Sequence, residues 1–426
     1  MPHRKPVPPL RSLCLSYFRD FGRLETASQQ QGTTVNRLVR RLRVKVSGDV
    51  LMAQRLMGAV LRSTSKLVQL NVSDSPFNDD LMEALAVSCP ALQDLNVSKC
   101  KQVTDVGLIT LYCTGDELNS GCRNITNLNV SSTSMTSDGV LFALQGWPNL
   151  LKLDADMLDF PPEGTDVPSG TYKLQTINFP LRYESLEQIH RLFPKLKSVD
   201  LSNYGVQYEA VPPVGALGEL QFLEELSIDA ENFPPHGIDI FKSLGGRIKA
   251  LELYGYHHVD LAEIAFVFPN LVRLVLFGCH FENTGRIYPA EAGLPRLRAF
   301  MLFRLGPYQS VEESFPANDI CSLLATCKEI EFLELTSIQV WTPEVIDTLA
   351  NSLLIKLLNR DVFQHLRELQ LWYCHRLTTR GILPVVRSNG SLRKLGLHHC
   401  DGLSQDDLQD IEEIINRNNL DLTLRY

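Results

Sequence analysis

The sequence predicts an α/β protein, built as a right-handed solenoid that curves into a horseshoe with a parallel sheet on its concave side. One apolar phrase occurs twice near the C-terminus, 26 residues apart: Leu366, Leu369, Leu371 and Cys374, then Leu392, Leu395, Leu397 and Cys400. The same phase can be followed back along most of the chain, each time as a short alternating strand followed by a helical segment. Repetition at this period is typical of solenoids, in which each repeat buries its apolar face against its neighbours.

The repeated phrase, L-x-x-L-x-L-x-x-C, is typical of leucine-rich repeats. The first strand is expected from Val39, and the last strand lies at Asp421 to Arg425, where it caps the core together with the helical stretch before it. These elements predict one leucine-rich-repeat domain of about fourteen repeats over residues 35–426. The later repeats begin at apolar residues 22 to 36 positions apart: Leu67, Leu92, Ile125, Leu150, Leu174, Leu196, Leu223, Ile248, Leu271, Leu297, Ile330, Leu366 and Leu392.

The second half of each repeat predicts a helix with defined ends. The phrases V-T-D-V-G-L from Val103 and L-T-T-R-G-I from Leu377 place Thr or Asp where a helix N-cap belongs. Prolines end the helices just before the next strand; they are Pro90, Pro148, Pro194, Pro269 and Pro295. The spacings are longest after Leu92, Leu297 and Ile330, so the extra residues there should loop out from the frame.

Residues 1–34 precede the repeats and form a separate N-terminal region. Four prolines within the first nine residues keep its start extended, and the stretch from Leu10 to Phe21 then has apolar residues at helical spacing. The polar run from Ser28 to Thr34 is interpreted as a linker. The sequence therefore predicts an N-terminal helix joined to the repeats.

Composition limits the class of protein. The chain of 426 residues is 44% apolar and 21% charged, which is enough for a large core, and its net charge of −8 argues against nucleic acid as a partner. No signal-peptide stretch and no run of about 18 uncharged apolar residues occurs. We therefore expect a soluble intracellular protein, cytoplasmic or nuclear, that does not bind membranes.

The ten cysteines are interpreted as reduced core residues. Seven of them occupy repeat positions where other repeats carry large apolar residues, which is how a small buried hydrophobe behaves. His257-His258 and His398-His399-Cys400 lack a second ligand pair at zinc spacing, so no metal or other cofactor is expected. No phosphate loop, G-x-S-x-G or HExxH motif is present. The sequence therefore predicts that this protein is not an enzyme.

Side chains alternate along a strand, so offsets 2, 4 and 6 of each repeat should point to the concave face. This face is acidic in the middle repeats and aromatic in the later ones. Two interpretations of the aromatic part stay open: it is a partner-binding surface, or the long insertions cover it. The acidic part also fits an ordinary solvated face. The predicted substrate-binding residues are Asp154, Asp156, Asp200, Asp229, Glu252, Tyr254, Arg273, Phe277, Met301, Phe303, Phe332 and Trp372.

The combination of L-x-x-L-x-L-x-x-C with a following Φ-T-D-x-G-L resembles the cysteine-containing (RNI-like) leucine-rich repeats of ubiquitin-ligase substrate receptors, many of which carry an F-box. The resemblance covers residues 39–424. It implies a non-catalytic protein that captures a substrate protein for a cullin-RING ligase. The repeats from Leu150 to Ile248 depart from the pattern, since they lack the cysteine and most of the T-D-x-G-L phrase.

Residues 9–18, P-L-R-S-L-C-L-S-Y-F, resemble the BC-box of elongin-binding receptors, and the layout is similar to the Zyg-type and Zer-type receptors. The resemblance implies that this helix binds elongin B/C and, with it, a cullin. Phe18 departs from the usual aliphatic residue, and no clear cullin-box follows residue 24. A degenerate F-box and a plain capping helix stay open as alternatives. The residues implied in adaptor binding are Pro9, Leu10, Leu13, Cys14 and Phe18.

Overall fold

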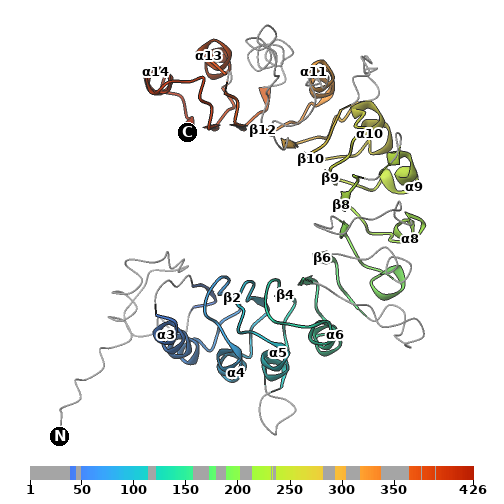
Figure 1. Ribbon diagram of the computed structural model, residues 1–426, viewed down its shortest axis with the longest axis vertical. Helices are drawn as coiled ribbons and strands as arrows, with labels where there is room; N and C mark the ends of the chain where they lie inside the picture. The colour runs from blue at the N-terminus through green and yellow to red at the C-terminus, as the bar shows by residue number, and fades with distance from the viewer. Residues whose placement is uncertain are drawn as a thin grey trace, which may run out of the picture. The chain divides into compact units, whose positions relative to one another are not determined.

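The structure is a computed structural model, and its elements repeat along the chain (Figure 1). Two compact units are present, one ending at Leu196 and one beginning at Lys197, and each is described by itself. The residues described are 39–44, 49–113, 121–156, 172–178, 189–201, 214–231, 233, 237–281, 293–303, 317–336, 364–375, 377–388 and 390–426.

The first unit is a parallel sheet covered by helices on one face. Its strands are three residues long and pair in chain order; they are β1 (Arg41–Arg43), β2 (Gln69–Asn71), β3 (Asp94–Asn96), β4 (Asn127–Asn129), β5 (Lys152–Asp154) and β6 (Thr176–Asn178). The helices follow the strands and pack against one another in sequence; they are α3 (Val50–Ser63), α4 (Asp79–Ser88), α5 (Asp105–Tyr112) and α6 (Ser137–Gly146).

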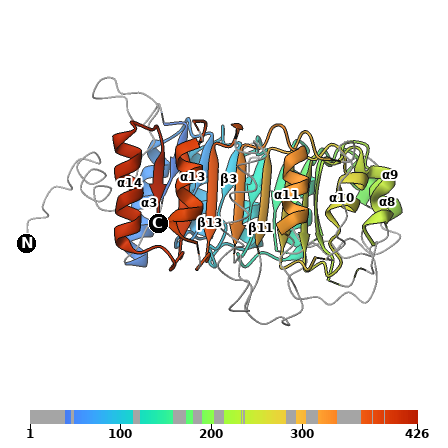
Figure 2. The same cartoon turned by 90° about the horizontal axis from the view of Figure 1, so that it is seen from above.

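The second unit continues the same scheme with longer strands, most of them five residues long. They pair in parallel and in chain order: β7 (Ser198–Leu201), β8 (Glu225–Asp229), β9 (Ala250–Tyr254), β10 (Arg273–Phe277), β11 (Ala299–Phe303), β12 (Phe332–Thr336), β13 (Glu368–Trp372), β14 (Lys394–His398) and β15 (Thr423–Arg425). Its helices are α8 (Val214–Gly218), η1 (Gly237–Phe241), α9 (Lys242–Gly245), α10 (Leu261–Val267), α11 (Ala317–Thr326), α13 (Thr379–Ser388) and α14 (Gln405–Arg417). Figure 2 shows α11, α13 and α14 upright beside the strands β11 and β13.

These observations confirm the predicted α/β leucine-rich-repeat solenoid. All fourteen strands expected from the repeat phase are present as β1 to β14, and the expected final strand is β15. The prolines also lie where they were predicted; α4 ends at Ser88, two residues before Pro90, and α10 ends at Val267, two residues before Pro269. The N-terminal helix and most of the three insertions lie outside the described residues.

Alternation along the strands builds the core. In β9, β11 and β12 every second side chain is buried, and the leucines at offsets 0, 3 and 5 are almost fully inaccessible. The helices cover this leucine side of the sheet, while the other side carries the residues at offsets 2, 4 and 6. We call that helix-free side the open face. Register is strongly specified, because a slip of one residue would expose every leucine.

The cysteines occupy the core as predicted, and they also hydrogen-bond between repeats. The Sγ of Cys100 donates to the Val72 carbonyl at 3.2 Å, and the Sγ of Cys279 donates to the Leu253 carbonyl at 3.3 Å. Burial raises the pKa of the Cys279 thiol to about 12, so this thiol stays protonated and unreactive at neutral pH. All nine cysteines in the described part of the chain are free thiols.

The T-D-x-G phrase caps a helix, as predicted, and it also connects neighbouring repeats. Thr104 caps α5. The Asp79 carboxylate of the previous repeat accepts hydrogen bonds from the Thr104 backbone N–H at 2.9 Å and from the Thr104 hydroxyl at 2.6 Å. A side chain at Gly107 would collide with that same carboxylate. The glycine is therefore needed because it leaves room for the aspartate of the preceding repeat.

The next repeat makes the same contacts. The Asp105 carboxylate accepts from the Thr136 backbone N–H at 2.9 Å and from its hydroxyl at 2.5 Å, and a Cβ at Gly139 would collide with Asp105. The phrase from Thr104 to Gly107 thus supplies a threonine to the repeat before it and an aspartate to the repeat after it.

No helix among the described residues is long and apolar enough to cross a membrane.

Candidate functional site: the open face of the second unit

The strand register sorts the open-face side chains of the second unit into three rows that cross the strands from β8 to β14. The outer row contains Glu225, Ala250, Arg273, Ala299, Phe332, Glu368 and Lys394. The middle row contains Ser227, Glu252, Val275, Met301, Glu334, Gln370 and Gly396. The third row, which we call the aromatic row, contains Asp229, Tyr254, Phe277, Phe303, Thr336, Trp372 and His398.

Rings in the aromatic row contact one another directly. The ring centroids of Tyr254 and Phe277 lie 5.6 Å apart, and those of Phe277 and Phe303 lie 5.7 Å apart. Trp372 and His398 are stacked at 3.9 Å. All five side chains are partly exposed. Aromatic pairs at these separations attract one another beyond the effect of burial, so the row is a preformed apolar surface.

Glu252 is the centre of a polar network at the β8–β10 end of the open face. It forms an ion pair with Arg273, and it accepts hydrogen bonds from the Tyr254 hydroxyl at 2.9 Å and the Ser227 hydroxyl at 3.2 Å. Its charge is therefore balanced within the chain. Two of the predicted binding residues, Glu252 and Arg273, hold each other in place.

Glu368 has a similar environment at the β13–β14 end. It forms an ion pair with Lys394 at 2.9 Å and accepts from the Gln370 amide at 3.0 Å. The other end of that amide, Gln370 Oε1, lies 3.2 Å from His398 Nε2. A Cβ at Gly396 would occupy the position of this Gln370 oxygen, so glycine is needed in the middle of β14 to admit the contact.

Glu334, in the middle row between these two networks, has no ion pair among the described residues. Burial raises the pKa of its carboxyl group, the negative charge of Glu368 raises it further, and the Trp372 indole partly offsets the shift. The indole Nε1 itself makes no hydrogen bond of normal geometry and is buried, as is the Thr336 Oγ1. The sequence-based list contains none of Glu334, Thr336 and Gln370.

The remaining acidic residues of the predicted list that belong to the second unit lie at its β7–β8 end. Asp200 lies in β7 and is partly buried. Asp229 ends β8, and burial raises the pKa of its carboxyl group, although the Glu231 backbone N–H donates to it at 3.1 Å. Met301 and Phe332 lie nearer the middle of the open face and are also partly exposed. All ten predicted residues of this unit therefore lie on one face.

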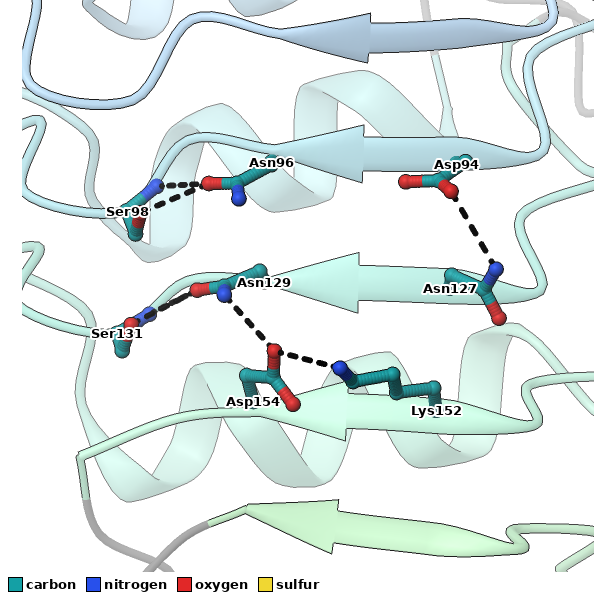
Figure 3. Close-up of polar contacts among 8 residues, drawn as sticks. All are labelled: Asp94, Asn96, Ser98, Asn127, Asn129, Ser131, Lys152 and Asp154. Atoms are coloured by element: carbon teal, nitrogen blue, oxygen red, sulfur yellow. Dashed lines mark hydrogen bonds and ion pairs between the residues drawn. The ribbon is translucent and has the colours of Figure 1, made fainter. Parts of the chain in front are cut away.

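Asp154 and Asp156 lie in the first unit, where Asp154 belongs to a polar network (Figure 3). The Asp154 carboxylate accepts from the Asn129 amide at 2.8 Å and lies 3.4 Å from Lys152 Nζ. Only 9% of Asp154 is exposed. Asp156 accepts from the Ser132 backbone N–H at 2.6 Å, where other repeats use a backbone carbonyl. Both carboxylates therefore have structural partners within the chain.

Asparagine and serine alternate along the same network. The Asn96 Oδ1 accepts from the Ser98 backbone N–H at 3.0 Å and hydroxyl at 2.8 Å, and Asn129 holds Ser131 in the same way at 3.1 and 2.8 Å (Figure 3). These bonds fix the turn at the end of each strand. The asparagines of this surface therefore stabilise the repeat itself.

The predicted adaptor-binding residues, Pro9, Leu10, Leu13, Cys14 and Phe18, lie outside the described residues.

Comparisons with known proteins bear on the fold. The family described as "Leucine Rich repeat" matches residues 88–111, which contain β3 and most of α5. A search of curated protein sequences finds no match to this chain.

Rad7 in its complex with Elc1 from yeast matches with a TM-score of 0.48 and 14% identity, over 84% of this chain and 86% of that one. The protein of the TLR13–ssRNA13 complex matches with a TM-score of 0.41 and 18% identity, over 80% of this chain and 50% of that one. A leucine-rich-repeat protein of Leptospira interrogans matches with a TM-score of 0.37 and 15% identity, over 88% and 87%. At such identities and TM-scores the likeness carries no information about ligands. The expectation that nucleic acid is excluded gains no support from these matches.

Proposed function

We propose that this chain is a non-catalytic, protein-binding subunit that recognises substrates for a cullin-RING ubiquitin ligase. The observation that carries the proposal is the aromatic row on the open face of the second unit, where Tyr254, Phe277 and Phe303 form one continuous ring contact. Contiguous, partly exposed aromatic side chains mark interaction sites. Aromatic residues and arginine also dominate the energetics of protein interfaces.

The open face suits an extended protein segment better than a small molecule. Its rows run across many parallel strands, and its polar groups lie at intervals between apolar ones, with Glu252–Arg273 near one end and Glu368–Lys394 near the other. A segment lying along the rows would meet apolar and charged groups in turn. The carboxylates Asp200 and Asp229 would add favourable charge for a partner with basic residues.

The link to a ligase rests on residues 9–18. By resemblance to the BC-box, Leu10 and Cys14 anchor elongin C, with Pro9, Leu13 and Phe18 beside them. The receptor then acts by proximity, because it holds its bound substrate close to the ubiquitin-transfer machinery. Such a subunit works in the cytoplasm or the nucleus and needs no cofactor.

A second candidate function is a leucine-rich-repeat adaptor without any link to a ligase. It is favoured by two departures in the sequence, Phe18 in place of an aliphatic residue and the lack of a clear cullin-box after residue 24. On this alternative the N-terminal helix only caps the first repeat, and the open face still binds a protein.

A pull-down with purified elongin B/C separates the two candidates. We expect the wild-type chain to retain elongin B/C and the Leu10→Ala/Cys14→Ala variant to lose it. The F-box adaptor is tested in parallel, since a degenerate F-box is the other way to reach a ligase. If the wild-type chain retains neither elongin B/C nor the F-box adaptor, the ligase proposal fails and the adaptor function stands.

A further inference from the structure

The open face of the second unit carries a partly buried glutamate, Glu334, that has no ion pair among the described residues. Glu252, Glu334 and Glu368 occupy the outer and middle rows between β9 and β13. Glu252 is paired with Arg273 and Glu368 with Lys394, but Glu334 makes no ion pair with any residue that the structure describes. Its carboxyl group is also partly buried. A partly buried carboxylate without a cation is unfavourable in the free protein, so a cation brought by a ligand is favoured there.

The neighbours of Glu334 are mostly apolar. Phe332 and Thr336 lie two residues away on its own strand, on the same face. In the strand register Met301 and Gln370 lie on either side of it. Phe303 and Trp372, from the aromatic row, lie on either side of Thr336. The carboxylate therefore lies on a partly buried surface that is rich in rings and a thioether, where water screens a charge interaction less than it does in bulk solvent.

Two further polar atoms near Glu334 are buried, and neither makes a hydrogen bond of normal geometry with a described residue. They are the hydroxyl oxygen of Thr336 and the indole Nε1 of Trp372. Buried polar groups without partners are uncommon and call for an explanation. Together with Glu334 they offer a carboxylate and a hydroxyl as acceptors, and one N–H as a donor, within two adjacent strands.

We propose that β11, β12 and β13 form a site for an arginine side chain on a bound protein segment. The guanidinium bonds to the Glu334 carboxylate and the Thr336 hydroxyl, and the Trp372 N–H donates to a carbonyl oxygen of the same segment. This proposal rests on the proposed function and names the chemical class of the partner that the open face recognises.

Charge and shape both favour arginine as the occupant. The two cations nearest in the rows, Arg273 and Lys394, are already engaged by glutamates, so an acidic ligand would find no free positive charge in these rows. A guanidinium is planar, carries five N–H donors and stacks on aromatic rings, so it can meet a carboxylate, a hydroxyl and a ring edge together. An ammonium group, as a compact point charge, uses the flat surfaces of Phe303, Phe332 and Trp372 less well.

A peptide array tests the site without requiring a known partner. The probes are immobilised decapeptides with a central arginine between randomised uncharged residues, and matched sets in which the arginine is replaced by citrulline or by lysine. Citrulline keeps the shape of arginine and removes its charge. The full-length chain is applied as wild type, as Glu334→Gln and as Glu413→Gln, after a thermal melt has shown that each protein is folded.

We expect the wild-type protein to retain arginine peptides about tenfold more strongly than citrulline peptides, because charge-assisted bidentate pairs are the strong ones. Glu334→Gln should remove this preference, and Glu413→Gln, on the helical side in α14 and paired with Arg417, should keep it. The proposal is overturned if wild type does not discriminate, if it binds no arginine peptide, or if Glu334→Gln still discriminates. Equal retention of lysine peptides would overturn the assignment to arginine.

The peptide array and the elongin pull-down test different proposals, so a negative result in one does not decide the other. A positive pull-down with a negative array removes the arginine site and leaves the ligase proposal in place. A negative pull-down with a positive array removes the ligase proposal and leaves an arginine-reading binding surface.

Discussion

At the scale of single residues, the burial of the Glu334 carboxyl group makes the stability of the folded protein depend on pH. Its pKa in the folded protein lies above the ordinary value of 4.5, chiefly because burial disfavours the charged form. The folded state therefore loses stability when this group is ionised. The loss is complete above the folded pKa, and it disappears as the pH falls below 4.5, where the group is protonated in both states.

We therefore expect Glu334→Gln to raise the melting temperature at pH 7 and to have a smaller effect as the pH is lowered toward 4. Thermal melts of both proteins across this pH range measure the difference. Glu368→Gln is the matched control on the next strand, and it should not stabilise the protein, because it removes the ion pair with Lys394. A melting temperature at pH 7 that is unchanged or lower in Glu334→Gln would contradict the prediction.

The aromatic row gives a second prediction at the residue scale. Trp372→Ala and Phe303→Ala should each weaken the binding of a protein partner by about 2 kcal/mol or more, because central aromatic side chains are the usual hot spots of interfaces. Phe277→Ala should act in the same direction. Phe266, which is 66% exposed on α10, belongs to the helical side, so Phe266→Ala is the matched control.

Partner affinities are measured on variants that remain folded. If Trp372→Ala, Phe303→Ala and Phe277→Ala all bind as tightly as wild type, the partner uses another surface of the chain.

At the scale of the elements, the contact between an aspartate and a glycine of neighbouring repeats predicts that replacing a helical glycine by alanine destabilises the protein, which is the opposite of the usual effect. Gly139 lies in the first turn of α6, where alanine is ordinarily the better helix former. Here a Cβ would displace the Asp105 carboxylate, which holds the Thr136 N–H and hydroxyl. We expect Gly139→Ala to destabilise the protein by about 1–3 kcal/mol, which is typical of overpacking.

A double-mutant cycle by chemical denaturation checks this explanation. Asp105→Ala alone loses the two hydrogen bonds, and the double variant Asp105→Ala/Gly139→Ala should be no less stable than that single variant, because the collision is then gone. Strict additivity of the two changes would show that the aspartate and the glycine do not interact.

The strands give a prediction about the C-terminal repeats. Leu395 in β14 is 1% exposed, so Leu395→Ala should destabilise these repeats by about 2–5 kcal/mol. Because each repeat of a solenoid contacts mainly its neighbours, hydrogen exchange should accelerate first in β13 to β15. An unchanged thermal melt, or exchange that accelerates equally in β1 to β6, would argue against this repeat phase.

At the scale of the whole molecule, the net charge of −8 predicts how a partner is captured. Partly exposed carboxylates such as Asp200 should speed the encounter with a basic partner more than they stabilise the final complex. We expect the association rate to fall as salt is raised, because exposed charges are screened beyond about 8–10 Å at physiological ionic strength. Asp200→Asn should lower that rate while the dissociation rate changes little, as stopped-flow kinetics would measure. Association that is insensitive to salt would rule out electrostatic steering.

The sequence by itself determined the repeat phase, and with it the positions of all the expected strands. The reason is physical: only one register of each strand buries its leucines, and a slip of one residue would turn Leu369 and Leu371 toward the open face. The same alternation predicted which side chains share that face, including Tyr254, Phe277 and Trp372. Helix ends were predictable wherever a proline or a capping threonine marked them.

Only the tertiary structure decided how the charges on that face are matched. The partners of Glu252 and Glu368 come from the next strand, 21 and 26 residues later, and the pairing depends on register and side-chain reach. Glu334 looks equivalent to Glu252 in the sequence, yet the outer-row position of the next strand, which supplies Arg273 to Glu252, is occupied by Glu368 in the case of Glu334. Gly107 and Gly139 likewise become necessary only once the aspartate of the preceding repeat is in place, because the collision they avoid is with another repeat.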